Sequence, residues 1–349
     1  MAKITIRLLL SLAISALFVW LSLRSTDVRA VAATIRGADP LPLLGYLAIL
    51  LVVHLVRTVR WGLLLEPLGH VGFKRLNAAS AVGFMLLMLL PLRLGELARP
   101  LLVSRAASGP QLRRSGAVAS CVVERAIDGL AVGILGIVAL RLLGASASGA
   151  AADYARYAAL LVTAGFFALC LGLALAFALR GRAIEIVRRA VGRVSPRAGE
   201  RIAGMLDGFI GALHLGSGLR VLGVVALTVA HWGLHAVGFM LLAPAFGMHL
   251  TALMACAVLA AQVVGVMIPA GPGMIGTSQF FAQLGLSIFV PGALSVPEVA
   301  ARAAGYANTI WMLQFGQQVA LGLCFWLWGH VSLAGVLGER ARELAADSR

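Results

Sequence analysis

The chain has 349 residues, of which 60% are hydrophobic and only 12% are charged. Soluble domains are about one quarter charged, so this composition excludes a soluble globular protein. The 29 Lys and Arg residues outnumber the 14 Asp and Glu residues. In so apolar a chain we interpret this excess as topology signals and contacts with anionic lipids, and not as a nucleic-acid interface. The sequence predicts an all-α polytopic membrane protein.

Six apolar segments are predicted to cross the bilayer, which takes about 20 residues per helix. They are 8–23, 41–65, 115–143, 157–179, a span that starts at 221, and 303–338. Residues 1–40 are expected to hold an uncleaved N-terminal anchor span and an outer loop. Residues 331–349 are expected to form a cytoplasmic tail.

Two further segments do not have the pattern of ordinary spans. Residues 76–107 hold an uncharged run that ends at Pro91, followed by a charged arm with more prolines. Residues 251–290 hold a second uncharged run, which the prolines and glycines of 269–276 interrupt. Charged or non-helical backbone at membrane depth is tolerated only inside the protein or beside a wet cavity. Both segments are therefore predicted to be re-entrant or broken-helix hairpins.

The distribution of basic residues predicts the orientation. If the N-terminus is inside, Lys74, Arg75, the Arg-rich segment 180–219 and the C-terminus all lie on the cytoplasmic side. Segment 180–219 has apolar residues at helical spacing. It is interpreted either as an amphipathic connector lying against anionic phospholipid headgroups or as a plain solvated helical loop. The expected location is a bacterial inner (plasma) membrane, with multiple spans and both termini cytoplasmic.

The two halves of the chain share a spacing. The interval from Gly69 to Pro91 equals the interval from Gly247 to Pro269, so one half matches the other at a constant offset. Repeat 1 is placed at 41–143 and repeat 2 at 220–330, with a connecting span at 144–179. Three full spans separate the starts of the two repeats. Because that number is odd, the repeats are predicted to be inverted, as in many secondary transporters.

The first cluster of polar residues lies at the turn of hairpin 76–107. Arg93 lies at the turn, Gly95 turns the chain, and Glu96 and Arg99 follow one helical turn apart. Guanidinium groups bind phosphate through paired hydrogen bonds, and a helix N-terminus adds positive dipole. Because charges inside a membrane are costly, we favour an anion or headgroup site. The alternative is a surface loop with topology-determining arginines.

The second cluster is Glu124, Arg125 and Asp128, inside the span 115–143. Glu124 and Asp128 are four positions apart and share one helix face. Two carboxylates so close raise the pKa of at least one, so the pair is a candidate for proton coupling. The equally weighted alternative is a structural network in which Arg125, or the Arg93 and Arg99 group, neutralises both acids.

The third cluster is the segment 269–279, in which two prolines and three glycines break an apolar run. Its GxGxxG pattern has no preceding strand and no βαβ unit, so a dinucleotide site is rejected. The helix N-terminus near Gly273–Thr277 is expected to offer free amides to an anion. Thr277, Ser278 and Gln279 are expected to add neutral polar groups.

Metal and cofactor chemistry is not expected. His231 and His235 are four positions apart but lack the third ligand of a zinc site, so they are interpreted as polar residues of a span. The four cysteines form no CxxC pattern. The sequence has no Ser-His-Asp order and no P-loop, and no enzymatic activity is expected.

These motifs, in this order and spacing, resemble the lysylphosphatidylglycerol synthase transmembrane-region family of flippase-like proteins. The resemblance covers roughly 41–328 and adds Asn77 to the motif of the first hairpin. It implies that Arg93, Glu96, Arg99, Glu124, Arg125 and Asp128 form a polar core in the first half, and that Pro272, Gly273 and Gly276 form its counterpart in the second half.

The chain departs from the family pattern at Gln279, where many members have Glu. Loss of that charge weakens the case for a cationic aminoacyl headgroup and favours a less charged lipid. No aminoacyltransferase domain is expected.

The leading hypothesis is an inner-membrane flippase that moves a phospholipid, a hopanoid or a polyprenyl-linked glycolipid through a cavity between the hairpins. A second hypothesis is a non-transporting scaffold that holds a lipid-synthesis or glycosyltransferase enzyme as its partner. A third is a membrane enzyme with Glu96 or Glu124 as general base. The intramembrane charges argue against the scaffold, and the missing nucleophile or metal site argues against the enzyme.

Overall fold

In a computed structural model, the described residues are 2–90, 95–106, 114–144, 150–193, 195–211, 217–268 and 270–328. They form α-helices and short 3₁₀ helices, and this part of the chain contains no strand. Thirteen α-helices are described: α1 (Ala2–Leu23), α2 (Val28–Arg36), α3 (Pro40–Leu65), α4 (Phe73–Leu89), α5 (Ala98–Ala106), α6 (Arg114–Leu143), α7 (Ala150–Ala178), α8 (Arg180–Gly192), α9 (Pro196–Gly211), α10 (Gly218–Leu242), α11 (Ala252–Val266), α12 (Thr277–Leu286) and α13 (Pro297–Leu327).

The all-α polytopic fold is confirmed. Among the described residues, five helices are long and apolar enough to cross a membrane: α3, α6, α7, α10 and α13. A sixth crossing is formed if α1 and α2 count as one span, and these two helices meet at an angle of 77°. The predicted span 303–338 begins earlier, at Pro297, and its residues 329–338 lie outside the described part of the chain.

Residues with known capping preferences set several helix starts. The Asp39 side chain accepts a hydrogen bond from the Leu41 amide at the start of α3, where Pro40 fills the first position. Ser217 caps α10 and Thr251 caps α11 in the same way. The local sequence thus determines where these helices begin.

The two predicted hairpins correspond to α4–α5 and α11–α12. These helices have 17, 9, 15 and 10 residues, which is short of the roughly 20 that a full crossing takes. The turn residues 91–94 of the first hairpin lie outside the described residues. That each hairpin enters and leaves the membrane on one side stays a prediction.

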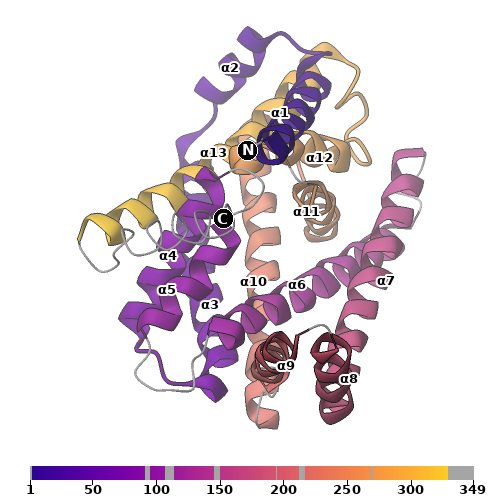
Figure 1. Ribbon diagram of the computed structural model, residues 1–349. Helices are drawn as coiled ribbons and strands as arrows, with labels where there is room; N and C mark the ends of the chain where they lie inside the picture. Colours follow the sequence, from indigo (N-terminus) through magenta and orange to yellow (C-terminus); the bar gives the residue numbers. More distant parts are fainter. Residues whose placement is uncertain are drawn as a thin grey trace.

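The helices follow the predicted offset closely. The starts of α3 and α10 are separated by the same interval as Gly69 and Gly247, and α11 and α12 begin one position later than that interval predicts from α4 and α5. Their packing is reciprocal: α4 packs on α13, α11 packs on α6, and α3 packs on α10 (Figure 1). Each half therefore holds the first arm of the other half's hairpin. The inverted relation of the halves and the domain boundaries stay predictions.

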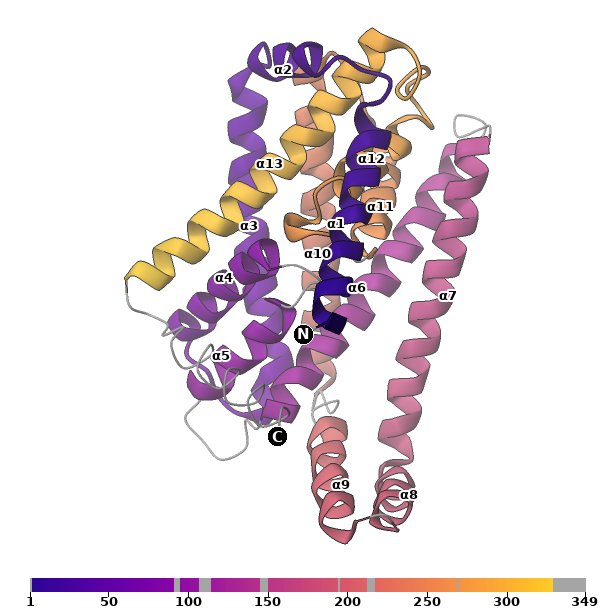
Figure 2. The same cartoon turned by 45° about the horizontal axis from the view of Figure 1, so that its top comes forward.

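The basic connector forms a pair of packed helices, α8 and α9. This pair lies at the opposite end of the molecule from α2 (Figure 2). Its acids pair with arginines: Arg188 contacts Glu185 and Glu200, and Arg180 contacts Asp207. Hydrogen bonds from Arg189 and Arg188 lower the pKa of Glu185, so this carboxylate stays charged at neutral pH.

The close contact of α3 with α10 depends on Gly238. A Cβ atom there would lie 2.6 Å from the ring of Tyr46, which is fully buried. We expect Gly238→Ala to lower the thermal unfolding temperature in detergent by several degrees, because overpacking costs about 1–3 kcal/mol. Gly233→Ala is the matched control, since a Cβ atom at that position of the same helix meets nothing within 4 Å. Equal unfolding temperatures for the two variants would contradict this packing.

Candidate functional site

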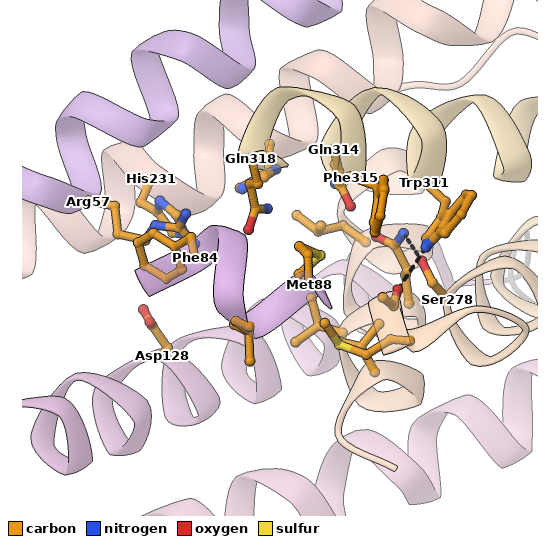
Figure 3. A pocket seen from close by; sticks show the side chains of 18 of the residues that line it. Arg57, Phe84, Met88, Asp128, His231, Ser278, Trp311, Gln314, Phe315 and Gln318 are labelled. Carbon is orange, nitrogen blue, oxygen red and sulfur yellow. Dashed lines mark hydrogen bonds between the residues drawn. The ribbon is translucent and has the colours of Figure 1, made fainter. Parts of the chain in front are cut away.

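A cavity of about 150 Å³ lies between the two halves of the chain (Figure 3). Helices of the first half, α3, α4, α5 and α6, form part of its wall, and α10, α11, α12, α13 and the turn before α12 form the rest. Its lining includes Arg57, Arg99, Glu124, Arg125 and Asp128. The cavity is therefore a charged chamber inside a bundle of apolar helices.

Arg60 of α3 is the centre of an ion network beside this cavity. Its guanidinium binds both oxygens of Asp128 on α6, with Nη2 donating to Oδ2 over 2.8 Å. Nη2 also donates to Oε1 of Glu124 over 3.1 Å. The Arg60 side chain is only 1% exposed, so its charge depends on these carboxylates for neutralisation.

Two residues of α10 complete the surroundings of Arg60 and Asp128. Thr228 accepts a hydrogen bond from Arg60 Nη1 over 3.1 Å, and Trp232 donates through Nε1 to Asp128 Oδ1 over 3.1 Å. Helices α3, α6 and α10 are thus joined through polar side chains in addition to their apolar contacts.

Arg99 of α5 neutralises the other oxygen of Glu124. Its Nη1 donates to Glu124 Oε2 over 2.9 Å, and its guanidinium lies over the rings of Trp61 and Phe84 at 4.2 and 4.3 Å. Cation–π contacts of this kind stabilise a cation that has few hydrogen-bond acceptors. Glu124 is therefore held by two arginines from two different helices.

Gly95 allows the chain before α5 to approach the backbone of α4 closely. A Cβ atom at residue 95 would collide with the backbone of Leu86 and Leu87 on α4. Glu96 lies one residue further and forms an ion pair with Arg125 over 3.3 Å. The predicted i, i+3 pair of Glu96 with Arg99 is therefore not the ion pair that forms, because Arg99 turns towards Glu124 and Glu96 towards Arg125.

Arg57 is the exception in this network. Among the described residues, no carboxylate lies within ion-pair distance of its guanidinium, and its Nε atom is buried without a hydrogen-bond partner. The guanidinium lies 3.2 Å from the ring centre of Phe84 and lines the cavity. The arginines Arg57, Arg60, Arg99 and Arg125 face the acids Glu96, Glu124 and Asp128. Among the described residues, these four arginines exceed the three acids by one positive charge.

The third predicted cluster, segment 269–279, provides the turn before α12. Gly273 and Gly276 have φ angles of +64° and +89°, which L side chains rarely adopt. Pro272 begins the short 3₁₀ helix of this turn, and Trp311 of α13 donates to the Gly273 carbonyl over 2.7 Å. Gly273 lines the cavity, whereas Pro272 and Gly276 are not among its lining residues.

Several backbone amides of this turn have partners within the protein. The Gly276 amide donates to Gln279 Oε1 over 2.8 Å, and the Gly271 amide donates to Ser15 of α1 over 2.8 Å. Thr277 donates through its hydroxyl to the Met274 carbonyl. Gln279 and Thr277 thus stabilise the turn and do not line the cavity. Ser278, which does line it, accepts a hydrogen bond from Gln262 over 2.8 Å.

Two predicted residues lie elsewhere. Asn77 of α4 is 2.9 Å from His54 of α3 through Oδ1 and Nε2, and it does not line the cavity. Its contact supports the pairing of α3 with α4. Arg93 lies outside the described residues.

The structure brings Glu96, Arg99, Glu124, Arg125 and Asp128 together through ion pairs. That they bind a substrate stays a prediction. Both acids of the i, i+4 pair are held by arginines, as in the structural alternative, although the main partner is Arg60. The sequence motifs do not include Arg57 and Arg60, because both lie near the end of a predicted span, where basic residues usually mark the membrane boundary. One sequence feature indicates a site all the same: the two arginines are three positions apart inside an apolar run, and charges inside a membrane are usually functional.

Neutral polar residues complete the lining of the cavity. His231 and His235 of α10 and Gln314 and Gln318 of α13 are among them. Within the part of the chain that the structure describes, no group of three or more His, Cys, Asp or Glu side chains is arranged to hold a metal ion.

The long apolar helices and the charged chamber between two broken hairpins define a multi-pass membrane protein with an intramembrane polar site. Residues 8–329 match the family model described as the lysylphosphatidylglycerol synthase TM region, so the chain belongs to this family. Comparison with curated proteins and with solved structures gives no match.

The Arg60 network predicts a large effect on stability. We expect Arg60→Ala to lower the free energy of unfolding by about 3–5 kcal/mol, because it leaves Asp128 buried without its main partner. The measurement is denaturant unfolding in detergent. The double variant Arg60→Met with Asp128→Leu should lose less than Arg60→Ala alone, since it removes both charges. A double variant that is less stable than Arg60→Ala would contradict the pairing.

Proposed function

We propose that this protein moves a lipid between the leaflets of a bacterial inner membrane, through the polar cavity between its two hairpins. The observation that carries the proposal is Arg57, a cation inside the bundle with no counter-ion among the described residues. An isolated charge in such a place is costly, and a bound anion removes that cost. A phospholipid or a polyprenyl-linked lipid supplies this anion as its phosphate.

The surroundings of Arg57 support a ligand of this kind. Arg99 and Arg125 line the same cavity, so a phosphate near Arg57 would lie in a positive field. The outer faces of the bundle are apolar, and α7, for example, has exposed Leu and Phe side chains along its length. The headgroup would occupy the chamber while the lipid tails remain in the bilayer.

Transport fits these residues better than catalysis. Glu124 and Glu96, the two candidate general bases, each form ion pairs with arginine. Each carboxylate already has an arginine beside it, and no group of the described residues is arranged as a nucleophile with a base or as a metal site, so we propose that the protein is not an enzyme. Coupling of transport to protons through Glu124 and Asp128 stays a prediction.

The second candidate function is a scaffold for a lipid-synthesis or glycosyltransferase enzyme. It would need neither Arg57 nor the cavity. The two functions are therefore separated by a variant that changes the cavity and leaves the surface intact.

The test uses purified protein in vesicles that contain a fluorescent phosphatidylglycerol. We expect the wild-type protein to raise the rate at which the label reaches the outer leaflet, and Arg57→Ala to lower that rate at least tenfold. Arg57→Lys should keep part of it, because the charge remains without paired hydrogen bonds. Arg36→Ala, at the exposed end of α2, is the control.

Transport by Arg57→Ala at the wild-type rate would contradict the proposal. No transport by the wild type, together with capture of an enzyme partner, would support the scaffold.

The connector α8–α9 is proposed to bind anionic headgroups on the cytoplasmic side. Within the described part of the chain, Arg182, Arg193 and Arg197 have no carboxylate partner, in contrast to Arg188 and Arg180. The exposed side chain of Ile186 lies one turn from Arg182 on the same helix. Arginines together with exposed apolar side chains on one helix are typical of helices that lie on an anionic membrane surface.

We expect replacement of Arg182, Arg193 and Arg197 by Gln to weaken the affinity of the detergent-purified protein for anionic lipid nanodiscs. Each basic residue near such a surface contributes about 1 kcal/mol. The loss should disappear at high salt, where the Debye length is short. Binding that is insensitive to both salt and these substitutions would contradict the surface contact.

A further inference from the structure

The two ends of the cavity differ in chemistry (Figure 3). Arg57, Asp128 and His231 lie at one end, and Ser278, Trp311 and Gln314 lie at the other, with Gln318 between them (Figure 3). One end is therefore charged and the other is neutral but polar. A ligand that fills both ends must carry a negative charge on one side and neutral polar groups on the other.

The charged end offers no place for a positive headgroup. Three arginines and two carboxylates line the cavity, which leaves one positive charge in excess. Both lining carboxylates are already bound by arginine, Glu124 through Arg60 and Arg99 and Asp128 through Arg60. Among the described residues that line the cavity, an ammonium group would find a positive field and no free counter-ion.

Neutral polar atoms next to the charged end lack partners. Nδ1 of His231, Nδ1 of His235 and Oε1 of Gln318 are buried, and none has a hydrogen-bond partner in the described part of the chain. All three residues line the cavity. Buried polar atoms are almost always hydrogen-bonded, and an unpaired one costs about 1–3 kcal/mol. These three atoms point to a ligand that supplies hydroxyl groups, because a hydroxyl both donates and accepts.

An aromatic surface lies beyond Gln318, at the neutral end. The rings of Trp311 and Phe315 stack with their centres 5.2 Å apart and an interplanar angle of 26°, and both residues line the cavity. Trp311 is fixed by its hydrogen bond to the Gly273 carbonyl. A flat apolar surface next to hydrogen-bonding groups suits a polyol or a sugar, which has C–H groups between its hydroxyls.

From these observations we infer that the transported lipid has a phosphate followed by an uncharged, hydroxylated headgroup: a polyol or a sugar. The phosphate lies at Arg57 and Arg99, and the hydroxyls reach the two histidines and Gln318. The inference rests on the proposed function, since it assigns the substrate class of the same cavity. It separates this chain's substrate from aminoacylated cationic lipids and from lipids without a phosphate.

The test is native mass spectrometry of the detergent-solubilised full chain with four lipids of equal acyl chains: phosphatidylglycerol, phosphatidylinositol, phosphatidic acid and phosphatidylethanolamine. We expect the two hydroxylated lipids to bind about threefold to tenfold more tightly than phosphatidic acid, as one or two added hydrogen bonds predict. Phosphatidylethanolamine should bind at least about tenfold more weakly than phosphatidylglycerol, because its ammonium group meets the excess positive charge.

Two neighbouring glutamines provide a matched pair of variants. Gln318→Leu should reduce the preference for phosphatidylglycerol over phosphatidic acid to near unity and leave the affinity for phosphatidic acid unchanged. Gln317→Leu is the control, since Gln317 is also buried with an unpaired amide but does not line the cavity. Arg57→Ala should weaken all the phosphate-bearing lipids together.

Equal binding of phosphatidic acid and the hydroxylated lipids would overturn the inference, and so would equal effects of the two glutamine variants. The transport proposal fails separately: selective binding without movement in vesicles would retain the headgroup assignment and reject the flippase. Transport without headgroup preference would retain the flippase and reject the headgroup assignment.

Discussion

Arg60 binds two carboxylates of α6 in the interior of a bundle whose outer surface is apolar, and much of the site depends on this interaction. Charges at such a depth are stable only when oppositely charged groups are fixed beside them. Asp128 and Glu124 have two oxygens each, so together they accept from Arg60, Arg99 and Trp232 at the same time. One helix therefore holds α3, α5 and α10 through polar contacts, and the cavity takes its shape from where those helices are held.

In the second half of the chain, the hairpin is held in place by hydrogen bonds between uncharged groups, where the first half uses ion pairs. Its broken hairpin is held by neutral hydrogen bonds: Gln279 caps α12, Ser278 pairs with Gln262, and Ser15 of α1 binds the Gly271 amide. Helix α1 thus closes the side of the second hairpin with its serine side chains. Although the two halves have similar helix spacing and reciprocal packing, one supplies fixed charge and the other supplies hydrogen-bonding groups. This asymmetry gives the cavity its two different ends.

Arg57 differs from the other arginines of the network because a contribution to the stability of the fold does not explain its position. Arg60, Arg99 and Arg125 each have a carboxylate partner, and their removal is expected to weaken the fold. Among the described residues, Arg57 has no carboxylate partner; its guanidinium lies over the ring of Phe84 and lines the cavity. A folded protein tolerates such a residue when the cost is recovered on binding a ligand. The arginines with a carboxylate partner are therefore expected to stabilise the fold, and the one without is proposed to bind the ligand.

The sequence by itself determined the class, the helices and the motifs. Long hydrophobic runs specify spans because backbone hydrogen bonds must be satisfied locally in lipid, and Pro91 and the glycines of 271–276 mark where helices break. The motif residues Glu96, Arg99, Glu124, Arg125 and Asp128 were also visible, since charges inside apolar segments are conspicuous. Their partners were not. Glu96 pairs with Arg125 and not with Arg99, and Arg60 of α3 binds two acids of α6, with two other helices between them in the chain. Gln279, expected to face an anion, caps its own helix instead. Only the tertiary structure decided these outcomes, because an ion pair or a cap is chosen by which groups the packing of distant helices brings within about 3 Å, and no local pattern encodes that distance.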